Sequence, residues 1–171
     1  MKKRLFSILI FAFAMLSCTA YASNNVSSID IDVLLNGDGS AEITQLWKGS
    51  FDEGTENYIV INNLDGMTVE DLSVSDDDGE YEVLPDWDID ASFEEKAEKC
   101  GIRTTDEGYE LCFGISGYGD RNYRIKYKID GLAGGYDDYD GFNFMFINRG
   151  MNPFPTDASV TVRLADGTAL D

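Results

Sequence analysis

Apolar residues alternate with polar ones in short runs along this chain, and Asp/Gly or Asn/Gly turns separate the runs. The clearest run is Arg121 to Ile129, which places two tyrosines and two isoleucines on one face and basic residues on the other. A period of two is that of a β-strand with one buried face. Ser28 to Leu35 repeats the pattern before the turn Asn36 to Gly39, and Ala41, Ile43 and Trp47 resume an apolar face after it. Residues 28 to 48 therefore predict a β-hairpin.

Six further short segments predict strands at regular spacing: Tyr58 to Ile61, Val69 to Ser75, Glu80 to Leu84, Tyr109 to Ile115, Phe142 to Ile147 and Ser159 to Leu164. The run Phe142 to Ile147 is apolar on both faces apart from Asn143, which predicts a central strand covered on both sides. Ser92 and Glu95 form a capping-box pattern for one short helix that Gly101 can end. We expect an all-β fold, an antiparallel β-sandwich of the immunoglobulin-like class, with about eight strands and this helix in a crossover.

The N-terminus has the pattern of a secretory signal peptide. A basic start is followed by the apolar run Leu5 to Leu16, too short for a comfortable membrane span, and by Ala20-Tyr21-Ala22. We expect residues 1–22 to be removed by cleavage between Ala22 and Ser23, which leaves an extracytoplasmic domain, residues 23–171. Lipidation of Cys18 is the alternative.

The charge and the missing histidine exclude several functions. The chain has 32 acidic and 13 basic residues, and three of the basic ones lie in the signal, so the mature charge is 10 minus 32, or −22. Such a surface repels nucleic acid and anionic lipid. With no histidine, a Ser-His-Asp triad, a Cys-His pair, a His-liganded zinc site and a His general base are all excluded.

Three Asp-rich loops resemble calcium sites: Asn36 to Ser40, Asp76 to Glu80 and Asp137 to Gly141. In an EF-hand-like loop the twelfth position is a bidentate Glu, whereas here it is Trp47, Trp87 or Asn148. We therefore interpret the loops as turns between strands, and expect no metal and no cofactor.

Two cysteines remain after signal removal, Cys100 and Cys112. An even pair in an exported chain is normally oxidised. A hairpin centred on Asp106 would place Cys100 opposite Cys112, with Ile102 opposite Glu110, and so predicts a disulfide between them. Two buried free thiols are the alternative.

Several segments in this order and spacing resemble the N-terminal extracytoplasmic domain of a bacterial family of predicted membrane proteins, DUF2207. The resemblance lies in the first hairpin with Ile43 and Thr44, the strand Tyr123 to Tyr127, and Tyr136 to Ile147 followed by Val160 to Leu164. Members typically continue into transmembrane helices, which this sequence lacks. We expect a truncated chain, incomplete at its C-terminus, or a secreted relative. Membrane contact is expected only if the native chain continues past Asp171 or Cys18 is lipidated.

These observations favour a non-enzymatic domain for protein interaction or sensing at the cell envelope, with another envelope protein or a glycan as the partner. A carbohydrate-binding module is the alternative, because exposed aromatic rings can stack on sugars. A carboxylate-dependent glycoside hydrolase is a further alternative, with Trp47, Trp87, Tyr118 and Tyr136 lining its cleft. We expect Trp47 in the core, Trp87 beside the helix, and the Tyr123 and Tyr127 row buried.

Overall fold

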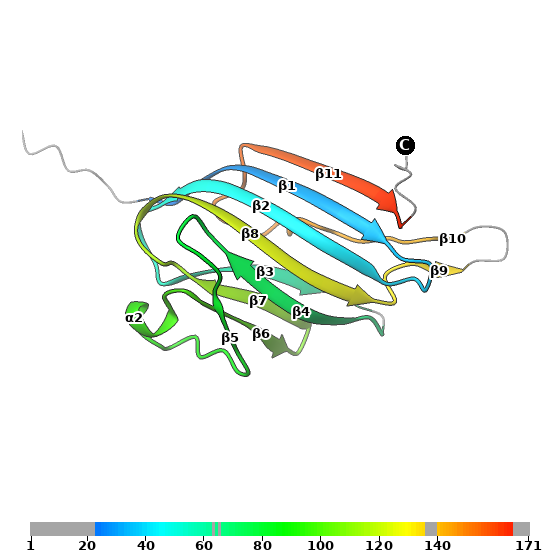
Figure 1. Ribbon diagram of the computed structural model, residues 1–171, viewed down its shortest axis with the longest axis horizontal. Helices are drawn as coiled ribbons and strands as arrows, with labels where there is room; N and C mark the ends of the chain where they lie inside the picture. The colour runs from blue at the N-terminus through cyan, green and yellow to red at the C-terminus, as the bar shows by residue number, and fades with distance from the viewer. Residues whose placement is uncertain (1–22, 63, 65, 136–139, 166–171) are drawn as a thin grey trace, which may run out of the picture.

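The computed structural model describes residues 23–62, 64, 66–135 and 140–165. Within them, two β-sheets pack face to face around one hydrophobic core, as Figure 1 shows. The first sheet has the strand order β11-β1-β2-β8-β4, and the second has the order β3-β7-β6-β5. The predicted all-β sandwich is thus confirmed. The elements are β1 (Asn25–Leu35), β2 (Ala41–Phe51), β3 (Glu56–Asn62), β4 (Thr68–Ser75), β5 (Glu82–Leu84), α2 (Phe93–Lys96), β6 (Lys99–Thr105), β7 (Gly108–Gly114), β8 (Gly119–Asp130), β9 (Gly134–Gly135), β10 (Asp140–Gly141) and β11 (Asp157–Leu164).

The predicted first hairpin is present as β1 and β2. The Asn36 amide donates to the Ser40 carbonyl over 2.9 Å, and the Gly39 amide donates to the Asn36 carbonyl over 3.1 Å. Gly39 has a φ of 85°, a conformation that glycine adopts without steric cost. The turn chemistry of the sequence therefore sets the register of the hairpin.

β8 lies inside the first sheet, between β2 and β4. Tyr123, Ile125, Tyr127 and Ile129 are buried, which confirms the predicted face. The Tyr123 ring contacts Phe113 of the second sheet edge-on, with ring centroids 5.1 Å apart. Aromatic contacts of this kind stabilise the interface between the sheets beyond the area that they bury.

The helix begins where the capping box predicts, but it ends earlier. Ser92 accepts from the Glu95 amide, and the Glu95 side chain accepts from the Ser92 amide. The helix stops at Lys96, because Lys99–Thr105 is drawn into β6, which pairs with β7. Strand pairing outweighs the helix propensity of the residues before Gly101.

The expected fully antiparallel arrangement is wrong in two places. β11 pairs with β1 in parallel, and β5 pairs with β6 in parallel. A parallel neighbour needs a crossover connection, and α2 lies in the crossover between β5 and β6. Strand direction depends on the path of the connecting segment, which the strand pattern does not contain.

The prediction of a central strand at Phe142 to Ile147 is also wrong. Only Asp140–Gly141, just before this run, pairs with another strand, β9. The run is an irregular segment whose aromatic side chains pack against the core, with Phe144 and Phe146 in edge contact at 4.9 Å between ring centroids. Its apolar residues cover the flank of the sandwich instead of joining a sheet.

Candidate functional site

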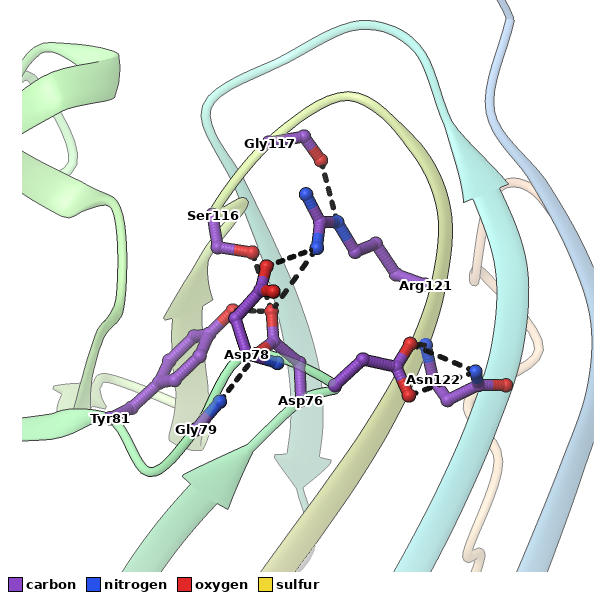
Figure 2. A network of polar contacts seen from close by, with 9 residues as sticks. Asp76, Asp78, Gly79, Tyr81, Ser116, Gly117, Arg121 and Asn122 are labelled. Atoms are coloured by element: carbon purple, nitrogen blue, oxygen red, sulfur yellow. Dashed lines mark hydrogen bonds and ion pairs between the residues drawn. The ribbon is translucent and has the colours of Figure 1, made fainter.

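The β4–β5 loop holds a dense polar network, shown in Figure 2. The Asp76 carboxylate is fully buried and accepts from the Ser116 hydroxyl at 2.5 Å and the Tyr81 hydroxyl at 3.0 Å. It also accepts from the amides of Asp78, at 2.8 Å, and Gly79, at 3.3 Å. Three of these donors lie in the β4–β5 loop, and Ser116 lies in the β7–β8 loop, so the carboxylate fixes the two loops to each other.

Arg121 adds a cation to this network. Its Nε donates to the Gly117 carbonyl at 3.0 Å, and its Nη1 pairs with Asp78 at 2.5 Å and lies 4.0 Å from Asp76. Burial opposes ionisation of Asp76, but its hydrogen bonds, led by the one from Ser116, outweigh burial and lower the pKa of the carboxyl. An ionised carboxylate whose oxygens are already occupied by donors is suited to holding a loop, not to proton transfer.

The Asp-rich loops before β2 and after β4 are turns, as interpreted from the sequence. In the first, the Asp38 carboxylate accepts from both the amide and the hydroxyl of Ser40, which lower its pKa. In the second, Asp76 closes the turn on Asp78 and Gly79. Across the described residues, no three His, Cys, Asp or Glu side chains group as metal ligands do. Residues 137–139 of the third loop lie outside the described part of the chain.

The predicted pairing of the cysteines is wrong. β6 places Cys100 opposite Phe113 and Gly101 opposite Cys112, one residue away from the expected register. Because neighbouring residues of a strand face opposite sides of the sheet, Cys100 lies in the central core and Cys112 on the other face. Both are free, buried thiols, and burial raises the pKa of Cys100 to about 11 and that of Cys112 to about 12.

Trp87 and Glu56 form a small buried cluster with the helix residue Lys96. The Trp87 indole donates to the Glu56 carboxylate, and the Lys96 ammonium lies 3.3 Å from the same oxygen. Lys96 also donates to the Ile89 carbonyl at 2.6 Å. The predicted positions of Trp47, in the core, and Trp87, near the helix, are thus confirmed, as is the burial of Tyr123 and Tyr127. Both tryptophans are largely buried, and Trp47 contributes to the wall of a cavity between β2 and β3.

Of the other residues named from the sequence, Tyr118 is exposed and rests on Phe93, with ring centroids 5.1 Å apart. Tyr136, Cys18 and the Ala22 side of the expected cleavage site lie outside the described residues. Cleavage before Ser23 therefore stays a prediction.

The sequence pattern did not indicate that β11 forms an open edge. β11 is the outermost strand of the first sheet, and no described residue pairs with its free side (Figure 1). Its register places Val160 beside Ile31 and Leu164 beside Leu35, on the inner face of the sheet. Yet Val160 is 47% exposed and Leu164 36%, whereas their neighbours on β1 are buried. We call this row, Ala158, Val160, Val162 and Leu164, the β11 row.

Solved structures give only distant likenesses. The M1 zinc metallopeptidase from Deinococcus radiodurans is 14% identical, with 84% of this chain and 32% of that chain covered and a TM-score of 0.36. A variant of the same enzyme is 16% identical, with 82% and 32% covered and a TM-score of 0.36. A putative protease from Parabacteroides distasonis is 11% identical, with 82% and 28% covered and a TM-score of 0.37. The chain spans about a third of the length of these proteins, and likeness this distant carries no argument on function.

No curated protein matches the chain. Within the described residues, no helix has the length and apolar character needed to cross a bilayer. The model of the predicted membrane protein (DUF2207) N-terminal domain matches residues 25–169, which is most of the sequence. The resemblance seen in the sequence is therefore confirmed, and the chain belongs to the DUF2207 N-terminal domain family.

Proposed function

We propose that this chain is a non-enzymatic, extracytoplasmic domain for protein interaction at the bacterial cell envelope, and that it binds an extended segment of another envelope protein along the open edge of β11. The signal-like pattern of residues 1–22 supports export. The observation that carries the interaction is the exposed β11 row beside an unpaired strand edge.

The edge of β11 offers backbone groups to a partner strand. The Ala165 amide donates to the Leu35 carbonyl of β1, which continues the ladder between the two strands. Because successive amides of a strand point to opposite sides, those of Val160, Val162 and Leu164 point away from β1. Added strands use such groups in β-augmentation.

The other long edge of the sheet is protected, and β11 is not. β4 has a register irregularity between Glu70 and Ser73, with Asp71 at a positive φ of 56°. Bulges and charges of this kind prevent edge-to-edge pairing. β11 pairs with β1 over eight residues without a register shift, and its inner face is apolar. A partner segment with apolar residues at every second position would extend that face.

A photo-crosslinking amino acid at Val160 tests this proposal in cells that make the full chain. We expect a discrete adduct with one protein from position 160 and little from position 161, because Thr161 points to the opposite face. Val160→Lys should reduce the adduct formed from a crosslinker at Leu164, while Thr161→Lys, which adds the same charge to the other face, should leave it. An adduct of twice the mass of the chain would identify a second copy as the partner. Equal crosslinking from positions 160 and 161 would contradict the proposal.

A further inference from the structure

A cavity of about 220 Å³ lies at the flank of the sandwich, between the start of β1, the middle of β2, β3 and the segment 146–153. It is separate from the open edge of β11 and from the Asp76 network. Five successive residues of β3, from Glu56 to Val60, contribute to its wall. Because β3 is an edge strand of the second sheet, the cavity occupies the place where a further strand would continue that sheet.

One side chain of the wall lacks a hydrogen-bond partner. Asn57 lines the cavity, and its amide nitrogen is buried with no acceptor among the described residues. An unpaired buried donor costs about 1–3 kcal/mol. The terminal torsion of asparagine is broad and roughly two-fold, so a half-turn of the amide exchanges its nitrogen and oxygen. A ligand oxygen in the cavity would then supply the missing acceptor.

A second amide of the wall is held in place from behind. Gln45 is buried, donates to the Tyr127 hydroxyl at 2.8 Å and accepts from the Trp47 indole at 2.8 Å. A side-chain amide carries two donor hydrogens and two acceptor lone pairs, so Gln45 keeps one donor and one acceptor beyond these bonds. A fixed amide with both functions matches a hydroxyl, which also donates and accepts.

The wall carries no uncompensated charge. Among the described residues that line the cavity, Glu56 is the one charged residue. The Lys96 ammonium neutralises its carboxylate, and the Trp87 indole donates a hydrogen bond to it. The rest of the wall is amide, aliphatic or aromatic, with the rings of Tyr58 and Phe146 beside it. Such a lining favours an uncharged ligand with an apolar face and several hydroxyl groups.

The size limits the ligand further. Sites for drug-sized molecules have volumes of about 300–1,000 Å³, and this cavity is smaller, with room for roughly seven waters at about 30 Å³ each. We propose that the cavity between β3 and the segment 146–153 binds one uncharged sugar residue, whose hydroxyls pair with the amides of Asn57 and Gln45. This site goes beyond the protein interaction proposed for β11.

NMR titration of the isotope-labelled mature chain tests the site. The probes are glucose, galactose, mannose and N-acetylglucosamine, each at millimolar concentration, with glucuronate as a charged analogue and N-acetylalaninamide as a peptide-like one. We expect at least one neutral sugar to shift the side-chain amide signals of Asn57 and Gln45 in a saturable way, and glucuronate to bind more weakly. No saturable shift from any neutral sugar, or binding of N-acetylalaninamide alone, would overturn the proposal.

Variants separate a binding role of Asn57 from a structural one. Asn57→Ala should weaken sugar binding at least tenfold, while Asn25→Ala, an exposed asparagine outside the cavity, should leave it unchanged. Because the Asn57 amide nitrogen has no partner, Asn57→Ala should melt no lower than the wild-type chain without sugar. A clear fall in melting temperature, or unchanged sugar affinity, would contradict the proposal. Val160→Lys should keep sugar binding, so failure of this site and failure of the β11 interaction can be told apart.

Discussion

Replacing Asp76 by alanine should destabilise the domain far more than replacing the nearby Asp78. Asp76 is fully buried and accepts two hydroxyl and two amide hydrogen bonds, whereas the Asp78 side chain is 61% exposed. In Asp76→Ala, the hydroxyls of Ser116 and Tyr81 lose their acceptor inside the protein. Water can reach the loop amides of Asp78 and Gly79 and replace their bonds.

The magnitude follows from the two hydroxyls that donate to the buried carboxylate, one on the buried Tyr81 and one on the half-buried Ser116. Each buried donor left without an acceptor costs about 1–3 kcal/mol, so Asp76→Ala should lower the free energy of unfolding by about 3 kcal/mol. For a chain of this length, each kcal/mol corresponds to roughly 2–4 °C in melting temperature. We expect a fall of roughly 6–12 °C. Asp78→Ala removes an exposed ion pair with Arg121, worth about 0–1 kcal/mol.

Asp76→Asn refines the test, because it keeps the shape of the side chain. One carboxylate oxygen accepts from the two loop amides and the other from the two hydroxyls. An asparagine oxygen can keep the first set, and its NH₂ can donate to hydroxyls that rotate to accept. Asp76→Asn should therefore recover much of the stability lost in Asp76→Ala. Urea denaturation followed by tryptophan fluorescence measures all three variants, and equal losses for Asp76→Ala and Asp78→Ala would refute this account of the network.

Three further predictions follow from the same structure. The pKa of Asp76 is lowered in the folded state. Its stabilising contribution is therefore present above the unfolded pKa of about 3.9 and is lost as the pH falls through the folded pKa. Urea denaturation at neutral and acidic pH should show that the stability difference between wild type and Asp76→Asn becomes smaller in acid. Thiol labelling without reductant should find Cys100 and Cys112 unreactive in the folded chain and both reactive after denaturation, and a single or absent label after denaturation would contradict free thiols. A Cβ on Gly114 would overlap the Lys96 carbonyl, whereas a Cβ on Gly37 would meet open space. Gly114→Ala should therefore destabilise the domain by about 1–3 kcal/mol or more, and Gly37→Ala should change its stability little, as thermal melts can measure.

The sequence predicts local structure well where turn chemistry and period agree. The hairpin around Asn36 to Gly39 and the buried face of β8 are of this kind, because both depend on residues close together in the chain. The cysteine register failed by a single residue. In the structure, a two-residue turn of Asp106 and Glu107 connects β6 to β7. The same sequence is also compatible with a three-residue loop centred on Asp106, which gives the predicted register. A shift of one position moves Cys112 to the other face of the sheet.

The remaining failures concern pairs of segments far apart in the chain. β11 lies more than a hundred residues after β1, and its parallel direction depends on how the segment after β10 crosses the sandwich. The apolar run Phe142 to Ile147 fits either a central strand or a cover for the core, and periodicity does not separate the two. The cavity could not be predicted from the sequence for the same reason, because residues 146–153 form one of its walls and their path is not contained in the local pattern.

The exposure of the β11 row and the cavity have a common structural cause. Within the part of the chain that the structure describes, the first sheet has five strands and the second has four, so the second sheet ends at β3 while the first continues to β1 and β11. The irregular segment after β10 fills part of the missing place (Figure 1). Its aromatic residues pack on the core. An irregular segment fills space less completely than a paired strand, so it leaves the cavity between itself and β3. It also leaves Val160 and Leu164 exposed beyond it. A complete fifth strand in the second sheet would fill the cavity and cover the β11 row, although the backbone edge of β11 would stay open. The difference in strand number therefore accounts for the cavity and for the exposure of the β11 row, the two features on which the proposed binding sites depend.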